Sequence, residues 1–418
     1  MSYIIKNKKI DKYPIKILLA FLIFTELFFW IGPIEYRLKN SFLLGTYLLI
    51  LNVCLYLGYM RGIQNFKCTT YNLSKPTLRI FIICGFCLTF LNVESLWKSH
   101  GVSISLGNLI SAISNPGEAY YAESDTEIST NYLTLILSPI VTGLLPVGIY
   151  YWYRIKKIGK ILIISSVLLT MIGWLGIGVR KGLMDIIVIS FFCIYARLRG
   201  LEDNLRLKRR LMFIAVFFIS IFILYFIFSN ISRYGGDGFA ALEMINNTNL
   251  KSWYINQLGT PISVALSFIE SYLCQGYYAL GLGLDHGIIL PSIFGSNWFT
   301  IAFAKKFGYD PTIYTYTYIL QNQGIDMSIN WHSLYLWLAN DFTFIGVPLI
   351  VFFIGYFFAQ TWCDCVRNRN VLAYPIMSLF VIMIFYAFAN NQVFSFSFIP
   401  FVVWFSLYKL KSHISRGL

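Results

Sequence analysis

About ten long apolar stretches run through this chain, and each is long enough to cross the roughly 30 Å hydrocarbon core of a bilayer as a helix. They lie near residues 15–33, 41–60, 77–97, 131–153, 161–179, 183–198, 211–229, 343–362, 371–389 and 393–408. Only 12% of the residues are charged, against about 25% in an ordinary soluble domain. This pattern predicts an all-α, polytopic integral membrane protein. It excludes a cytosolic enzyme, a secreted disulfide scaffold and a disordered chain.

The basic residues alternate along the chain in the way that sets membrane topology. Several lysines precede the first apolar stretch, and no small-residue cleavage site follows it, so we interpret this stretch as a retained signal-anchor. Most of the 33 Lys and Arg residues fall in every second loop, which predicts cytoplasmic N- and C-termini. The net charge of +14 is therefore a topology signal, and we expect no nucleic-acid partner.

Two segments that this topology assigns to the outer side are too long to be simple turns. The first covers residues 98–130, and the second covers residues 230–342. The second divides the chain into an N-terminal membrane bundle (1–229), a large outer loop (230–342) and three C-terminal spans with a cytoplasmic tail (343–418).

Local patterns within these outer segments predict further structure. The first segment has apolar residues at helical spacing, which predict a short interfacial helix: Leu106, Leu109, Ile110 and Ile113. In the second, residues 261–284 are apolar, but Glu270 and Gln275 near their centre favour a surface or re-entrant helix over a full span. The choice between ten and twelve spans stays open. Cys274 is the one cysteine on the outer side, which excludes an external disulfide and predicts labelling from outside.

Two arginines stand at the outer ends of spans, against the expected charge bias. Arg180 lies in Gly-Val-Arg-Lys-Gly, and Arg233 lies in Ser-Arg-Tyr-Gly-Gly-Asp-Gly. They could be structural, reaching the headgroups while Lys181 pairs with Asp185 and Arg233 with Asp237. Alternatively they clamp an anionic group at the outer leaflet, because a guanidinium binds phosphate through two hydrogen bonds and stays charged.

The large outer loop also carries aromatic and titratable side chains. The aromatic residues could stack on sugar rings or form an ordinary interfacial belt: Tyr277, Tyr278, Tyr309, Tyr314, Tyr316, Tyr318, Trp298 and Trp331. The groups that could exchange a proton near neutral pH are His332, Asp285, His286 and Asp341. Each of them taken singly is more often structural than catalytic.

Two segments resemble a known family. Ser-Tyr-Leu-Cys-Gln-Gly-Tyr-Tyr-Ala-Leu-Gly-Leu-Gly-Leu (271–284) and Trp-His-Ser-Leu-Tyr-Leu-Trp-Leu-Ala-Asn-Asp-Phe-Thr-Phe-Ile-Gly (331–346) are similar to the late loop of Wzy-type polymerases of surface polysaccharide repeat units. A cytoplasmic N-terminus, many spans and one large outer loop before the last three spans also resemble that family. The first 150 residues resemble no family.

The resemblance implies a GT-C-like membrane glycosyltransferase of the bacterial cytoplasmic (inner) membrane. Such an enzyme moves a glycan from polyprenyl diphosphate onto the non-reducing end of another lipid-linked repeat unit, in O-antigen or capsule synthesis. Its implied partners are these lipid-linked glycans, the bilayer, and a chain-length regulator and a flippase in the membrane. The acidic motif Glu123-x-Asp125-x-Glu127 resembles the acidic pair of GT-C enzymes, but acidic outer loops are common. We therefore expect neither a metal nor a cofactor.

The implied reaction assigns a role to each candidate residue. Fixed cations should meet the charge that develops on the diphosphate leaving group, and the candidates are Arg180 and Arg233 with Lys181 behind them. An acceptor hydroxyl needs a general base in an inverting mechanism, and we expect His332 ahead of Asp341 and Asp285. The expected sugar contacts are Tyr277, Tyr278 and Tyr335.

Two alternatives stay open. A lipid-linked glycan flippase or another transporter would also present cations to a diphosphate, but transporters usually carry polar residues at mid-membrane and have repeated halves. Here Glu26 and Asp185 are the exceptions in nearly uncharged spans, and the two halves differ. An O-antigen ligase, which joins finished polymer to lipid A core, has a similar architecture.

Overall fold

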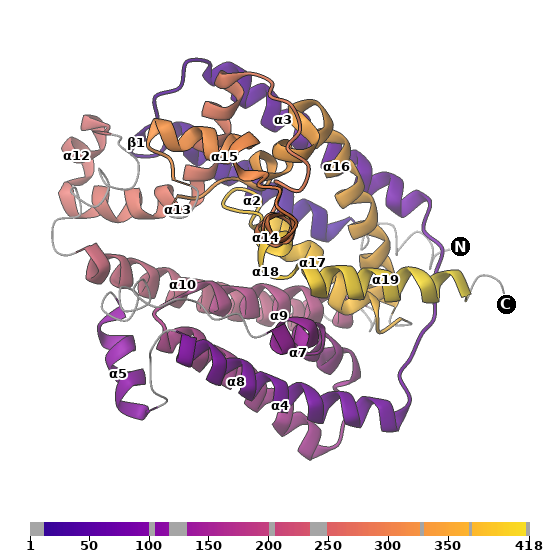
Figure 1. The fold of residues 1–418 in the computed structure, drawn as a ribbon. Helices are drawn as coiled ribbons and strands as arrows, with labels where there is room; N and C mark the ends of the chain where they lie inside the picture. The colour runs from indigo at the N-terminus through magenta and orange to yellow at the C-terminus, as the bar shows by residue number, and fades with distance from the viewer. Residues whose placement is uncertain are drawn as a thin grey trace. The chain divides into compact units, whose positions relative to one another are not determined.

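The computed structural model describes residues 12–99, 105–116, 132–199, 205–234, 249–326, 330–367 and 370–414, and these residues are almost entirely helical (Figure 1). A short antiparallel pair joins β1 (Ile34–Glu35) to β2 (Asn249–Leu250), with Ile34 opposite Leu250. The predicted all-α class is confirmed.

A helix overlaps each apolar stretch that we expected to span the membrane. In chain order these helices are α2 (Tyr13–Ile31), α3 (Ser41–Gln64), α4 (Lys75–Ser99), α7 (Tyr132–Tyr151), α8 (Lys157–Gly176), α9 (Lys181–Arg199), α10 (Leu205–Tyr234), α16 (Leu334–Arg367), α17 (Ala373–Phe385) and α19 (Phe398–Ile414). Within the described residues, five helices are long and apolar enough to cross a membrane: α2, α3, α4, α8 and α16. The chain thus has the helices of a membrane protein. The number of crossings and their direction stay predictions.

Further helices lie between these in the chain. They are α5 (Leu106–Ser114), α12 (Ser252–Leu258), α13 (Thr260–His286), α14 (Trp298–Lys306), α15 (Tyr316–Ile319) and α18 (Gln392–Phe396), with the short 3-10 helices η1 (Thr312–Tyr314) and η2 (Leu320–Gln323). Helix α5 is the short helix expected from the apolar spacing in the first outer segment, and Ser105 caps it by accepting a hydrogen bond from the Asn108 N–H. Residues 117–131, with the acidic motif from Glu123 to Glu127, lie outside the described residues.

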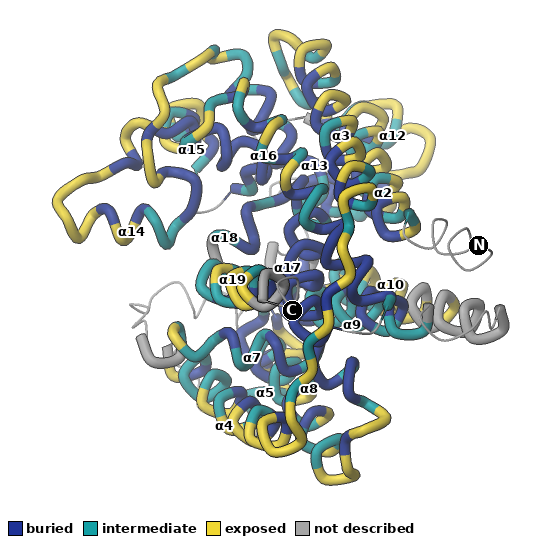
Figure 2. The backbone as a smooth tube through the Cα atoms, turned by 90° about the vertical axis from the view of Figure 1, so that its right-hand side faces the viewer, coloured by how far each residue is buried: buried dark blue, intermediate teal, exposed yellow. Residues whose placement is uncertain are grey.

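Large apolar side chains are exposed along the faces of the long helices. On α3, Phe42 is 84% exposed and Leu49 is 63% exposed, while Leu48 and Leu51 on the other face are buried. Figure 2 shows such exposed stretches along α3 and α4. A soluble protein would not leave this much apolar surface in water, so the exposed faces match a lipid environment.

The chain divides into two compact units. The first unit combines residues 1–66, 237–360 and 380–398. In it, α3 and the middle of α16 come into backbone contact: a Cβ at Gly58 would lie 1.9 Å from the Phe352 carbonyl oxygen. Helix α13 packs along α2 and α3 in the same unit. Small residues at such crossings let two helices approach closely, as in other membrane bundles.

The second unit combines residues 67–236, 361–379 and 399–418. Here α4 packs against α8 and α7, and Figure 1 shows α4 and α8 side by side. The indole N–H of Trp97 donates to the Gly173 carbonyl oxygen at 3.0 Å, which ties α4 to α8. Each of the two units combines stretches that are far apart in the sequence, and they do not follow the expected boundaries at residues 229 and 342. The three-part division along the chain stays a prediction.

The structure corrects two expectations for the second outer segment. Helix α13 does not expose its central polar groups, because Glu270 and Gln275 are buried inside the first unit, and the re-entrant alternative stays a prediction. The Ile34 N–H donates to Glu270 at 2.6 Å, and the Trp331 N–H donates to Gln275 at 2.9 Å. Cys274 on the same helix is 0% exposed, so labelling this cysteine from outside in the folded protein is no longer expected.

Candidate functional site

His332 lies just before α16 and is almost fully buried, with 1% of its surface exposed. Its Nδ1 atom is 2.9 Å from the main-chain oxygen of Asn330. Because a carbonyl oxygen can only accept, Nδ1 carries the ring proton and Nε2 presents a lone pair. Nε2 has no hydrogen-bond partner among the described residues. The imidazole is therefore held in the tautomer that a general base needs.

Burial also sets the charge of this ring. Removal from water disfavours the imidazolium and lowers the pKa of His332 to about 4, against smaller opposing effects of the Asn330 carbonyl and Asp326. The ring is therefore neutral near pH 7, and the same burial makes it a weaker base than an exposed imidazole.

Two tryptophans continue from His332 toward the surface. The Trp337 ring lies 6.3 Å from the imidazole centre, and the Trp298 ring lies 5.6 Å from Trp337. Trp337 is 1% exposed, and its Nε1 has no hydrogen-bond partner among the described residues. Trp298, at the start of α14, is half-buried. His332 and Trp337 are thus two buried neighbouring rings that each carry a nitrogen without a partner among the described residues, and the ring of Trp298 packs against Trp337.

Asp341 is engaged by four donors. Its carboxylate accepts from the Ser292 hydroxyl at 3.1 Å and the Gly295 N–H at 2.6 Å. It also accepts from the N–H and the hydroxyl of Ser296, at 3.2 and 2.6 Å. This set anchors the turn before α14 to α16. The structure gives Asp341 an anchoring contact, and its action as a base stays a prediction.

Asp285 lies in the last turn of α13. Its carboxylate accepts the Lys39 N–H at 2.9 Å, in an exposed hydrogen bond. This contact ties the end of α13 to the connection between α2 and α3. As with Asp341, a role as base stays a prediction.

The three tyrosines expected to touch sugar differ in accessibility. Tyr277 is 0% exposed, and its hydroxyl lies 2.9 Å from the Thr25 hydroxyl on α2. Tyr335 is 2% exposed, whereas Tyr278 is half-buried and its ring lies 5.2 Å from that of Tyr36. Tyr277 and Tyr335 thus belong to the packing of the first unit. Of the three, Tyr278 is the one with a partly open ring.

Arg180 lies in the turn between α8 and α9 and is only 6% exposed. Its Nε donates to the Ser229 hydroxyl at 2.8 Å, and one terminal nitrogen donates to the Asn230 side-chain oxygen at 3.0 Å. The guanidinium also lies 5.2 Å from the Phe226 ring centre. The Nδ2 atom of Asn230, a donor, has no hydrogen-bond partner among the described residues. Donors therefore gather beside the N-terminus of α9, where the helix dipole also favours an anion.

The other predicted cations have different surroundings. Lys181 pairs with Asp185 at 2.6 Å within the first turns of α9, as the structural interpretation expected. Arg233 lies in the last turn of α10, but its side chain and Asp237 are outside the described residues.

The predicted site residues fall into two groups. His332, Asp341, Asp285 and the three tyrosines belong to the first unit, and Arg180, Lys181 and Arg233 belong to the second. Sequence reasoning placed all of them in one outer layer. The structure describes the two groups separately.

Sequence reasoning missed several residues next to the candidates. Asn391 donates to the Ser296 carbonyl oxygen at 2.6 Å, yet its own side-chain oxygen has no hydrogen-bond partner among the described residues. The run Asn390, Asn391 and Gln392 between two apolar stretches was a visible signal, since three successive amides are costly at membrane depth. Trp337 and Asn230 carried no such signal, because an isolated Trp or Asn in an apolar helix is ordinary.

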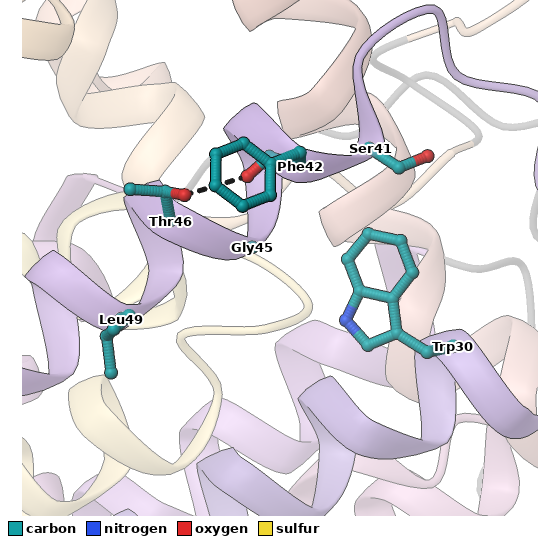
Figure 3. Close-up of a pocket in the computed structure, with 6 residues that line it drawn as sticks. All are labelled: Trp30, Ser41, Phe42, Gly45, Thr46 and Leu49. Carbon is teal, nitrogen blue, oxygen red and sulfur yellow. Dashed lines mark hydrogen bonds between the residues drawn. The ribbon is translucent and has the colours of Figure 1, made fainter.

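A separate groove lies on the surface of the first unit, between the end of α2 and the start of α3 (Figure 3). Its volume is about 430 Å³, and its lining residues are Trp30, Ser41, Phe42, Gly45, Thr46 and Leu49. This lining offers hydroxyls and apolar surface but no titratable group. The groove suits a hydrocarbon chain and not acid–base chemistry.

Comparison with known proteins gives no relative: no protein-family model, no curated protein and no solved structure matches this chain.

Proposed function

We propose that the protein is a glycosyltransferase that polymerises lipid-linked oligosaccharide repeat units on the outer face of the bacterial cytoplasmic membrane, with both termini in the cytoplasm. The observation that carries this proposal is the buried, neutral His332, with Nδ1–H directed to a carbonyl and Nε2 left as an acceptor. The resemblance of residues 271–284 and 331–346 to Wzy-type polymerases points to the same chemistry.

The proposed step balances in bonds and charge. The acceptor hydroxyl oxygen attacks the anomeric carbon of the donor sugar, and the bond from that carbon to the diphosphate oxygen breaks. The hydroxyl proton passes to Nε2 of His332. The diphosphate leaves with the bonding electron pair, and Arg180 meets its charge together with the Asn230 N–H donor.

The test is deletion of the gene in its native host, followed by gel analysis of the surface glycan. Loss of long chains, with a single repeat unit still attached to its anchor, supports a polymerase. Free polymer that never reaches its anchor indicates a ligase instead. An unchanged glycan contradicts both.

One observation favours a second candidate, the transport of a lipid-linked glycan. Glu26 lies inside α2, and both of its carboxylate oxygens accept from the Asn52 amide, at 2.8 and 2.9 Å. A carboxyl group within a membrane-type helix is costly and is typical of transport pathways. In a transporter, deletion would leave the repeat units on the cytoplasmic side, unreachable by an external glycosidase.

A further inference from the structure

Two neighbouring buried atoms in the first unit lack hydrogen-bond partners among the described residues. They are Nε2 of His332 and Nε1 of Trp337, on rings whose centres are 6.3 Å apart. Both residues are only 1% exposed. A buried polar atom without a partner costs about 1–3 kcal/mol. A single group that donates to one atom and accepts from the other would satisfy both.

The chemistry of the two atoms restricts that group. Nε2 is an acceptor, because the ring proton is on Nδ1, and the indole Nε1–H is a donor only. A carboxylate or phosphate could accept from Trp337 but could not donate to His332. An ammonium group could do only the reverse. A hydroxyl both donates and accepts, so it fits the pair.

The two rings are neighbours, which is the first condition for one oxygen atom to reach both nitrogens. Two N···O hydrogen bonds of about 2.9 Å place the nitrogens up to about 6 Å apart. The ring centres are 6.3 Å apart, with 66° between the planes, and the site requires the two nitrogens on these rings to come within that reach. The half-buried Trp298 against Trp337 adds an apolar face of the kind that packs on the C–H face of a sugar.

We propose that His332 and Trp337 form the binding site for the attacking hydroxyl of the acceptor sugar, an inference that rests on the proposed function. The Trp337 N–H donates to the hydroxyl oxygen and orients it. The hydroxyl proton points at His332 Nε2, which receives it as the new glycosidic bond forms. Trp337 is then a substrate-binding residue of the transfer.

The first test measures binding without reaction. The protein has four histidines, so ¹⁵N-histidine labelling in detergent gives few signals, and His332→Gln identifies the His332 signal by its loss. The probe is the repeat-unit oligosaccharide released from its lipid diphosphate, which offers the acceptor hydroxyl but has no leaving group and cannot react. We expect this probe to shift the Nε2 signal of the wild-type protein. In Trp337→Phe, which keeps an aromatic ring but lacks the N–H, we expect roughly tenfold weaker binding by the same signal.

The second test measures chain extension and has a matched control. Trp362 lies in the part of α16 beyond the break at Thr343, in the second unit, is 0% exposed and also has an indole nitrogen without a partner among the described residues. Trp362→Phe should leave the chain-length ladder unchanged, whereas Trp337→Phe should shorten it. If Trp337→Phe fails to fold, benzothienylalanine at position 337 replaces it, because this analogue keeps the shape of indole and has sulfur in place of the N–H.

The outcomes separate this inference from the proposed function. If the Trp337→Phe variant binds the probe as tightly as the wild type does, the role of Trp337 is overturned, but the proposed function is not. Loss of polymer on gene deletion, without any shift of the His332 signal, overturns the hydroxyl site as a whole. An unchanged glycan on deletion overturns the proposed function itself.

Discussion

The buried imidazole of His332 gives the folded protein a pH dependence that an exposed histidine would not give. Burial lowers its pKa to about 4 in the folded state from about 6.5 for an exposed imidazole, so between these values the unfolded chain binds more protons. Stability is therefore full above about pH 6.5 and falls as the pH drops toward 4, by roughly 3 kcal/mol for a shift of this size. Thermal unfolding in detergent across this range measures the effect.

The control for this pH dependence is His332→Gln, which cannot titrate. We expect this variant to lose most of the stability change between pH 6.5 and 4, and to lose polymerisation at neutral pH. Equal pH profiles for the variant and the wild type would show that other groups account for acid unfolding, and a normal ladder would exclude His332 as the base.

Arg180 leads to a prediction that separates charge from geometry. Its guanidinium uses different nitrogens for Ser229 and Asn230, which fixes its plane. Arg180→Ala should abolish long chains, and Arg180→Lys should restore only part of the activity, roughly a tenth or less, because an ammonium lacks the planar fork. Glycan gels at matched protein level give the readout.

Lys181→Ala provides a comparison with Arg180, because it removes the second predicted cation, whose partner in the structure is Asp185. That pair is partly exposed, so its loss should change the free energy of unfolding by about 1 kcal/mol or less. Full activity of Arg180→Ala would leave the arginine with the structural role alone.

At the scale of elements, the contact between α3 and α16 depends on glycine. A Cβ at Gly58 would meet the Phe352 carbonyl oxygen at 1.9 Å, whereas a Cβ at Gly45 on the same helix would have Trp30 at 3.7 Å. Gly58→Ala should therefore destabilise the protein by about 1–3 kcal/mol. Gly45→Ala should be neutral or stabilise by up to about 1 kcal/mol, through helix propensity. Thermal midpoints in detergent distinguish the two, and equal midpoints would contradict close packing at Gly58.

The sequence predicted the long helices well, because runs of about twenty apolar residues allow few structures other than a helix. It gave no indication of how α13 accommodates the buried Glu270. Residues far away in the sequence accommodate this carboxylate. The Ile34 N–H donates to one of its oxygens, and glycine at position 32 leaves room for it, because a Cβ there would lie 2.3 Å from the carboxyl carbon. Contacts separated by more than 200 residues carry no local pattern in the sequence.

The candidate site was predictable to a similar degree. His332 was identified as a residue type within a recognisable segment, but its tautomer depends on the Asn330 carbonyl, which only the backbone path places beside the ring. Asp341 carried the same chemistry in the sequence. Only the folded structure brings four donors from the turn before α14 to the Asp341 carboxylate. These hydrogen bonds distinguish Asp341, which anchors the turn, from His332, whose Nε2 has no partner among the described residues.

For the whole molecule, the alternating basic loops predict which segments are outside. Because Cys274 is buried, a topology test needs cysteines at exposed positions in a variant without native cysteines. Leu290 in the outer segment is 87% exposed, and Ile158 near the expected cytoplasmic loop at 154–160 is 73% exposed. A membrane-impermeant maleimide on intact spheroplasts should label Leu290→Cys at once and Ile158→Cys only after permeabilisation.

Cys274 itself supplies the internal control for that experiment. A variant that retains only this cysteine should resist the maleimide in intact and in permeabilised cells, and should react once detergent and denaturant unfold the protein, because its thiol is fully buried and lies 3.4 Å from the Thr25 carbonyl oxygen. The reverse pattern, with Ile158→Cys labelled in intact cells and Leu290→Cys protected, would invert the topology. His332 would then face the cytoplasm, where acceptor sugars on the outer leaflet could not reach it, and the proposed polymerase would be excluded.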